Sequence, residues 1–513
     1  MAWEPLVVLV ALLIGMLGAS ATTQVLCARL GANLIATLRL YLSKKMMQMD
    51  YEKLADRKNV VFGALIEDVG RMAPLVVIAP LIAYNVLLIT ICAIYLLRLS
   101  PLLFAVLTCG LLFPLALSWL VTKSTKVRFR AMLAQENIVF EALHALTDGK
   151  KEMSLNSGRA THFLEKILDP AIEKHRIVMS EAHLRLGLNE AWSSTMLYVS
   201  IVSVVFAGHV VFGLSVQQVT AFVIGSLFLI GPIGFIVHSI QQAQMGFAST
   251  RRLEELGLGM PTSANDVENG VRLSSVKPKG WKKLAMKSVT YRYPGLSDSN
   301  YGLGPIDLEI ARGETVFLVG GNGSGKSTLL MILCGILTPR SGEILMDDQN
   351  ILSDRRAYQD RFSGVFGDFY LFSHVLDRAG NIASDEMVMA WLEQLQLDQQ
   401  VEVKDGVLSR LALSTGQRKR VALLNCYAED REIVFFDEWA ADQDPSFRSH
   451  FYYEILPALK RQGKTLVVIS HDDRFFSMAD RVIKMESGCI VSNVVNTGTA
   501  FAAEGKGEGM SVA

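Results

Sequence analysis

The segment Gly320-Gly-Asn-Gly-Ser-Gly-Lys-Ser-Thr328 decides the fold of the second half of the chain. It follows an apolar strand-like run, residues 315–319, and precedes an apolar helix-like run, residues 329–337. In this context a glycine-rich loop can bind phosphate, because backbone N–H groups and the helix N-terminus face the anion. We therefore expect an α/β domain in which Lys326 reaches the phosphates and the Ser327 hydroxyl binds Mg²⁺. The alternative to a phosphate-binding loop is a chance match of the motif in a glycine-rich turn. Chance matches are rarer when a strand-like and a helix-like segment flank the motif.

Two further apolar runs end in polar residues. Residues 433–436 lead into Asp437 and Glu438, and residues 467–470 lead into His471. A strand buried on both faces has no structural reason to end in adjacent carboxylates unless they meet a cation or water. We therefore assign Mg²⁺ binding to Asp437, polarisation of the attacking water to Glu438 and sensing of the terminal phosphate to His471. A lone histidine is more often structural, but its place after a buried strand favours the functional interpretation.

The first half of the chain, residues 1–250, is predicted to be an all-α membrane domain. The chain is 50% hydrophobic and 19% charged, with a mean hydropathy of +0.31, whereas soluble domains carry about 25% charged residues. A helix needs about 20 residues to cross a hydrocarbon layer of ~30 Å. The uncharged runs predict five spans, at about residues 5–28, 74–97, 99–122, 191–213 and 218–240. A cleaved signal peptide is disfavoured for the first run, which lacks a basic start and a good cleavage site.

Charge and composition divide the rest of the chain. Lys and Arg are concentrated in residues 29–71 and 123–190, so we place these two stretches in the cytoplasm. We expect them to continue the membrane helices. The N-terminus then lies outside. Residues 251–283 are predicted to be a linker, residues 284–492 a nucleotide-binding cassette, and residues 493–513 a disordered tail. Neither half is basic enough to indicate nucleic-acid binding. The six cysteines form no Cys-x-x-Cys pair, which argues against a zinc site.

Leu413-Ser-Thr-Gly-Gln417 opens a helix expected over residues 418–428, with Ser414 as its N-cap. The order of phosphate loop, this motif, paired acids and histidine resembles the ATP-binding cassette (ABC) family over residues 284–490. The resemblance implies ATP and Mg²⁺ as cofactors, ATP hydrolysis, and a homodimer in which two cassettes sandwich the nucleotide. It assigns adenine stacking to Tyr293. It assigns the other contacts to ATP, some of them from the partner cassette, to Gly320, Asn322, Gly323, Ser324, Gly325, Lys326, Ser327, Thr328, Ser414, Thr415, Gly416, Gln417 and Asp444.

Two positions depart from the family pattern. In Val365-Phe-Gly-Asp-Phe-Tyr-Leu-Phe372, Gly367 stands where the family usually has a glutamine that contacts the metal and the attacking water. Asp368 is a candidate partial substitute. The usual Ser-Ala-Leu-Asp loop reads Ala441-Asp-Gln-Asp444 and keeps its final aspartate. Because the catalytic glutamate and histidine are present, we still expect hydrolysis.

The segments at residues 436–445, 470–473 and 149–156 resemble cyclic-peptide and peptide-siderophore exporters of the pyoverdine, syringomycin and microcin type. This resemblance implies export of a cyclic peptide or peptide-siderophore precursor across a bacterial inner membrane by alternating access. A lipid or lipopeptide flippase and a non-transporting membrane regulator are the alternatives. Exporters of this type have six spans, and the first span here resembles their second. We therefore expect either a misplaced start at Met1 or a five-span protein, and favour the former.

The predicted spans contain few candidates for cargo contact. No Asp, Glu, Lys or Arg lies in the middle of a span, and His209 and His238 fall near span ends. The polar candidates are Gln24, Asn85, Thr90, Thr108, Ser194, Ser200 and Ser203. Hydrogen bonding between helices is an equally good explanation for these residues.

Overall fold

The computed structural model describes residues 4–55, 58–259, 280–293 and 302–496. The chain divides into two compact units. A helical unit spans residues 1–271 apart from residues 50–52, which group with the second unit, and the second unit continues from residue 272. Each unit is described by itself.

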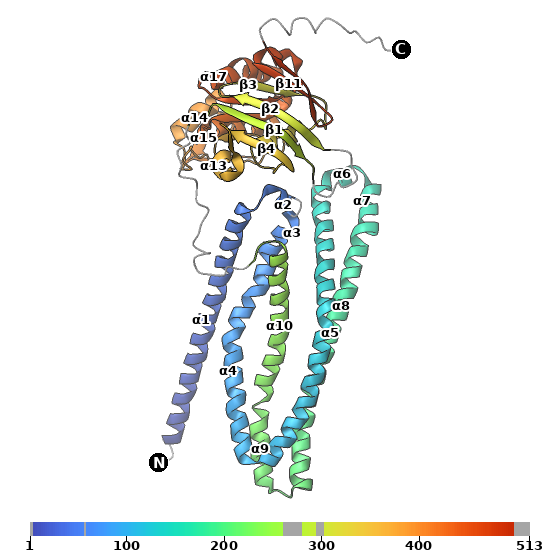
Figure 1. Ribbon diagram of the computed structural model, residues 1–513. Helices are drawn as coiled ribbons and strands as arrows, with labels where there is room; N and C mark the ends of the chain where they lie inside the picture. Colours follow the sequence, from blue (N-terminus) through green and yellow to red (C-terminus); the bar gives the residue numbers. More distant parts are fainter. Residues whose placement is uncertain (1–3, 56–57, 260–279, 294–301, 497–513) are drawn as a thin grey trace. The chain divides into compact units, whose positions relative to one another are not determined.

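Long helices build the first unit (Figure 1). Among the described residues, five helical stretches are long and apolar enough to cross a membrane, as the uncharged runs predicted. The long helices are α1 (Glu4–Gln48), α4 (Val69–Leu99), α5 (Pro101–Asp148), α8 (Asp169–Phe206), α9 (Val216–Leu227) and α10 (Ile230–Glu255). The short segments are α2 (Tyr51–Ala55), α3 (Lys58–Gly63), α6 (Lys150–Leu155), α7 (Ser157–Phe163), and the π-helical turns η1 (Ala64–Asp68), η2 (Leu164–Leu168) and η3 (Ala207–Val211).

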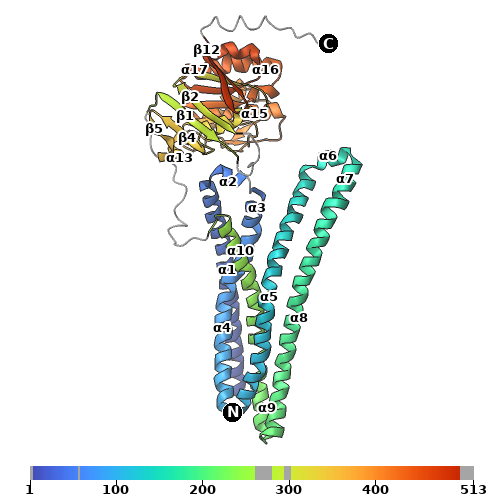
Figure 2. The same ribbon diagram turned by 45° about the vertical axis from the view of Figure 1, so that its right-hand side comes forward.

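Helices α5 and α8 run side by side, as Figures 1 and 2 both show. They approach closely at Gly110, where an added Cβ would lie 2.8 Å from the hydroxyl oxygen of Ser200. A buried hydrogen bond of 2.9 Å from the Asn189 amide to the Ser118 hydroxyl also joins them. Small residues and interhelical hydrogen bonds are the usual means of pairing helices in lipid, where apolar burial gives little drive.

A buried polar cluster joins η1 to α10. The Asp68 carboxylate is fully buried and accepts a hydrogen bond of 2.8 Å from the Ser249 hydroxyl. The Arg252 guanidinium, one turn along α10, lies 3.5 Å from the same carboxylate. Because a buried charge is costly without partners, these contacts favour one register of α10 against η1.

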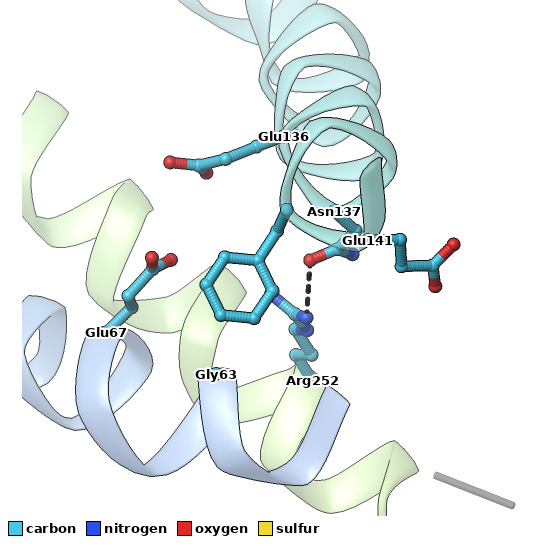
Figure 3. Close-up of a pocket in the computed structure, with 7 residues that line it drawn as sticks. Gly63, Glu67, Glu136, Asn137, Glu141 and Arg252 are labelled. Atoms are coloured by element: carbon cyan, nitrogen blue, oxygen red, sulfur yellow. Dashed lines mark hydrogen bonds between the residues drawn. The ribbon is translucent and has the colours of Figure 1, made fainter. Parts of the chain in front are cut away.

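The same cluster reaches α5 (Figure 3). Arg252 donates a hydrogen bond of 2.9 Å to the amide oxygen of Asn137, and Arg71 on α4 donates to both carboxylate oxygens of Glu136 at 3.0 Å. Figure 3 shows the Glu67 and Glu136 side chains extending into one small space between the helices. The cavity there measures about 20 Å³, which is room for about one water molecule.

Helix ends differ in places from the sequence-based boundaries. The fifth predicted span is divided at Phe228, where α9 gives way to α10. Helix α10 continues to Glu255, inside the predicted linker, and most of the rest of that linker (residues 260–279) lies outside the described residues. Strand β12 extends to Val495 because it pairs with β11, so residues 493–495 belong to the sheet rather than to the predicted tail. The remainder of the tail, residues 497–513, is not described.

The described part of the second unit contains two larger sheets and a two-stranded antiparallel sheet of β7 (Val403–Lys404) and β8 (Val407–Leu408). The central sheet has the order β12-β11-β3-β10-β9-β6, and every neighbouring pair except β11–β12 is parallel. A second, antiparallel sheet has the order β2-β1-β4-β5. The strands are β1 (Lys283–Tyr291), β2 (Leu303–Ala311), β3 (Thr315–Val319), β4 (Ser341–Met346), β5 (Gln349–Asn350), β6 (Phe362–Val365), β9 (Ile433–Asp437), β10 (Thr465–Ile469), β11 (Arg481–Glu486) and β12 (Cys489–Val495).

The central strands are buried on both faces. Along β3, Phe317 packs in one hydrophobic cluster, whereas Val316 and Leu318 pack in the other. Helices in the described part of this unit include α12 (Lys326–Leu333), α13 (Arg355–Gln359), α14 (Asp385–Gln394), α15 (Thr415–Glu429), α16 (Pro445–His450) and α17 (Leu456–Arg461). In such sheets, ligands bind at the carboxyl ends of the strands, where the polar residues singled out above follow β3, β9 and β10.

Candidate active site

The glycine-rich loop connects β3 to α12 through three residues with positive φ. Gly320, Gly323 and Gly325 have φ of 144°, 76° and 98°. At Gly320 an added Cβ would lie 2.2 Å from the carbonyl oxygen of Met485, so no other residue fits without moving the backbone. The loop is therefore shaped by the glycines that the motif predicted.

Lys326 begins α12 and turns its side chain into the loop. Its ammonium donates hydrogen bonds of 3.0 Å to the carbonyl oxygens of Gly320 and Gly321. Burial lowers the pKa of this ammonium, and the nearby Glu438 and Asp437 carboxylates oppose that shift. The arrangement holds a positive charge inside the loop, at the N-terminus of a helix.

Ser327 and Asp437 come from different elements and meet at the strand ends. The Ser327 hydroxyl donates a hydrogen bond of 3.2 Å to the Asp437 carboxylate. Burial raises the pKa of Asp437, while its hydrogen bond with Ser327 lowers it. Two oxygen ligands of this kind suit Mg²⁺, which takes only one or two protein ligands beside substrate phosphates and water.

Glu438 and His471 lie beside each other at the ends of β9 and β10. The Nε2 atom of His471 is 2.9 Å from a carboxylate oxygen of Glu438. Both side chains are about two-fifths exposed, so water can reach them. Glu438 has φ 48° and ψ 33°, a left-handed conformation that is strained for a residue other than glycine. In this conformation the backbone leaves the extended path of β9 at Glu438.

Gly367 follows β6 and faces the same site. An added Cβ would meet only one atom within 4 Å, the Oδ2 atom of Asp437 at 3.7 Å. A longer side chain would therefore have room and would extend toward the aspartate. Among the described residues, no hydrogen bond or ion pair joins the exposed Asp368 to Asp437 or Glu438.

Ser414 caps α15, as its sequence position predicted. Its hydroxyl accepts a hydrogen bond from the Gln417 backbone N–H, and the Ser414 backbone N–H donates one to the side-chain oxygen of Gln417. This capping box fixes Thr415 and Gly416 at the exposed start of a helix. Within the part of the chain that the structure describes, no hydrogen bond joins this segment to the phosphate loop.

Residues that the sequence analysis did not identify hold this segment in place. Lys419 is buried and donates a hydrogen bond of 2.8 Å to the Glu438 carbonyl oxygen. The Gln443 amide donates to the Gly416 carbonyl oxygen at 3.0 Å, and Arg420 binds the Asp444 carboxylate at 2.6 Å. The sequence signal that could have identified Lys419 is the presence of a basic residue on the buried face of a helix.

Asp444 and Tyr293 lie at the edges of the site. The Asp444 carboxylate caps α16 by accepting from the Phe447 backbone at 2.9 Å, and this hydrogen bond and the neighbouring Arg420 lower its pKa. The Tyr293 hydroxyl lies 3.1 Å from the Thr328 hydroxyl, so the aromatic ring stands beside the phosphate loop. The ring is about one-third exposed, which leaves a face available for a base.

The residues present fit a magnesium nucleotide. The Ser324 hydroxyl is buried in the loop and has no hydrogen-bond partner among the described residues. A phosphate oxygen would satisfy this hydroxyl and balance the charge of Lys326. Asn322, also in the loop, is exposed at the same surface.

Comparisons with known proteins agree with this site. The profile described as "ABC transporter" matches residues 303–441. The chain is 34% identical to the ATP-binding protein SyrD of Pseudomonas syringae pv. syringae over 90% of its own length and 83% of that protein. It is 35% identical to the macrolide export ATP-binding/permease protein MacB of Haemophilus ducreyi, over 37% of this chain and 29% of that one. A solved bacterial Atm1-family ABC exporter with ATP bound matches 95% of this chain and 87% of its own, with a TM-score of 0.74 and 16% identity.

Proposed function

Because the chain belongs to the ABC transporter family and is an ATP-hydrolysing, multi-pass membrane exporter, we propose that it exports a peptide across a bacterial inner membrane. The cargo is a cyclic peptide or a peptide-siderophore precursor, and the working unit is a homodimer. The observation that carries the proposal is the similarity to SyrD, which covers the membrane helices as well as the cassette.

The proposed chemistry is hydrolysis of the terminal phosphate of ATP. Glu438 orients and polarises the attacking water, and His471 holds the Glu438 carboxylate through their contact of 2.9 Å. Lys326 and the backbone of the loop bind the phosphates. Mg²⁺, held by Ser327 and Asp437, neutralises negative charge on the phosphates when it is bound.

The homodimer is supported by the exposed capping box of α15. Ser414, Thr415 and Gly416 present the N-terminus of a helix to solvent, and such a terminus binds anions. The ABC transporter profile matches residues 303–441 of the chain. A second copy can therefore supply the helix terminus that completes the site around the terminal phosphate.

The ATPase assignment predicts different losses at two residues. Lys326→Ala removes the phosphate-binding ammonium and should abolish ATP binding. Glu438→Gln should retain ATP binding, because glutamine keeps the size of the side chain, but turnover should fall by a factor of about 10² or more. ATP binding and hydrolysis by the purified full chain in lipid vesicles measure both effects.

Glu393→Gln, on the exposed surface of α14, is the matched control and should leave turnover unchanged. Wild-type turnover in Glu438→Gln would contradict the assignment of the base. Stimulation of wild-type turnover by cyclic or siderophore-like peptides would support the cargo class.

A second candidate, a membrane regulator that does not transport, is favoured by one observation. Gly367 leaves the Asp437 site without the side chain that the family usually places there. A regulator would show nucleotide-dependent conformational change with little cargo-stimulated hydrolysis. The same assay therefore separates the two functions.

A further inference from the structure

A pocket of about 120 Å³ lies between α8 and α10, at the span ends that the charge distribution places toward the cytoplasm. Its wall is partly apolar and partly polar. The polar residues include Glu190, Ser193 and Ser194 from α8 and His238 from α10. Apolar and polar groups side by side are typical of pockets that bind small organic groups.

Several other polar side chains in the described membrane helices are hydrogen-bonded within their own helix. Each donates to the carbonyl oxygen four residues earlier, at 2.6–2.8 Å, as seen for Asn85 (through its amide), Thr90, Thr108, Thr195, Ser200 and Ser203. These contacts explain most of the polar residues that the sequence offered for a cargo path. They leave those side chains with little capacity to bind a ligand.

Ser193 differs from these residues. Its hydroxyl is buried and has no hydrogen-bond partner among the described side and main chains. A buried hydroxyl without a partner is unfavourable, and a ligand in the pocket would relieve that cost. Ser194, the neighbouring pocket residue, is exposed.

Glu190 supplies the charge of the pocket. Its side chain is exposed, and it takes part in no ion pair or hydrogen bond recorded among the described residues. The Nε2 atom of His238 lies 3.1 Å from the Gln242 amide nitrogen. This contact engages the ring with a residue of its own helix. The Glu190 carboxylate therefore gives the pocket its negative charge.

We infer that this pocket binds a positively charged group, an ammonium or a guanidinium, on the exported peptide. The Glu190 carboxylate is the counter-ion, and the Ser193 hydroxyl and the Tyr198 ring complete the polar side. Leu197 and Ile233 pack against the carbon chain that carries the charge. This inference rests on the proposed export function and adds a charge requirement to the cargo.

The first experiment measures the charge selectivity of the pocket without any cargo. Ser194→Cys, in the purified full chain in dodecyl maltoside, is treated with a trimethylammonium or a sulfonate methanethiosulfonate reagent. Mass spectrometry of the peptide that contains residue 194 separates its modification from that of the six native cysteines. Adding Glu190→Gln should lower the ratio of cationic to anionic rates about tenfold. An unchanged ratio would overturn the inference.

Thr195→Cys is the matched control. Thr195 is exposed on the same helix and does not line the pocket. Its ratio of rates should change little when Glu190→Gln is added. An equal change at both positions would mean that Glu190 acts on the whole surface, and the pocket would then lose its assignment.

The second experiment uses cargo-like probes in phosphatidylglycerol vesicles, whose headgroups carry no ammonium. A cyclic octapeptide with one lysine is compared with the same ring carrying norleucine, by stimulation of ATP hydrolysis. The lysine peptide should act at about tenfold lower concentration. Glu190→Gln should remove this difference when stimulation is expressed relative to the basal hydrolysis of the same variant. Glu173→Gln, on α8 but paired with Arg176 outside the pocket, should preserve the difference.

The outcomes separate the two proposals. Charge selectivity at residue 194 without stimulation by either peptide would refute peptide export but retain a cation site. Equal stimulation by both peptides would support export and overturn the charge requirement. Stimulation by added phosphatidylethanolamine that depends on Glu190 would assign the pocket to a lipid headgroup and overturn its assignment to peptide.

Discussion

At the scale of single residues, the site owes its chemistry to conformations that few side chains tolerate. Glu438 adopts a left-handed conformation at the end of a buried strand, where it meets His471. Gly320 has a positive φ, and a Cβ at this position would collide with the neighbouring strand, so only glycine fits. Glu438 combines a strained backbone with exposure to water, as functional residues often do.

Gly367 provides a residue-scale prediction. Gly367→Gln should fold normally, because an added Cβ makes only an ordinary contact with Asp437 at 3.7 Å. The new amide would reach the expected Mg²⁺ site and should lower the Mg²⁺ concentration needed for half-maximal hydrolysis several-fold. Titration of ATP hydrolysis with Mg²⁺ measures this effect.

Gly367→Leu is the control, since leucine fills similar space without a ligand atom. A decrease in the Mg²⁺ requirement for leucine as well would mean that side-chain volume, and not the amide, is responsible. An unchanged requirement for the glutamine variant would show that the side chain at this position does not reach the metal.

At the scale of elements, the polar cluster at η1 connects three helices. Asp68 on η1 meets Ser249 and Arg252 on α10, and Arg252 continues to Asn137 on α5. A fully buried carboxylate balanced by arginine keeps its neighbours in place, and removing one partner leaves a charge without compensation. The stability of each of these helix segments therefore depends on the others.

Asp68→Ala tests this dependence. The variant should lower the stability of the helical unit by about 3–5 kcal/mol, because Arg252 loses its buried counter-ion. Thermal unfolding in detergent measures the loss. Glu173→Ala, which breaks an exposed pair with Arg176, should leave the unfolding temperature nearly unchanged. Equal losses in the two variants would refute a special role for the cluster.

At the scale of the whole molecule, the central sheet of the cassette carries a hydrophobic layer on each face. Cys334 lies in one layer and Cys426 in the other. Burial raises the pKa of both thiols to about 12, so the reactive thiolate is scarce in the native protein at pH 8. Since unfolding returns these thiols to a pKa near 9.0, the native state should lose stability as the pH rises from about 9 to 12.

The two thiols report on cooperative unfolding. In urea at pH 8, iodoacetamide should begin to label Cys334 and Cys426 at the same urea concentration, because both layers depend on one sheet. Cys489 is exposed and should react in native protein, which makes it the internal control. Mass spectrometry of the labelled peptides measures all three. Labelling of one buried thiol at much lower urea would show that the layers unfold separately.

The sequence by itself determined the features that depend on local patterns. Apolar runs of membrane length predicted five spans, and the described residues contain five helical stretches long and apolar enough to cross a membrane. The glycine-rich motif predicted the loop between β3 and α12. Burial and backbone hydrogen bonding act on residues that are close in the sequence. The residue patterns that they require can therefore be recognised from the sequence alone. The motif order was also sufficient to indicate the family, which the similarity to SyrD confirms.

The tertiary structure alone decided which distant residues meet. Strand order places β9 beside β10, which brings Glu438 within 2.9 Å of His471. Helix pairing joins α8 to α10 around the pocket at Glu190 and leaves the Ser193 hydroxyl without a hydrogen-bond partner among the described residues. Such contacts depend on packing between segments far apart in the chain, and hydrophobic periodicity specifies the buried face of a segment without specifying its neighbour.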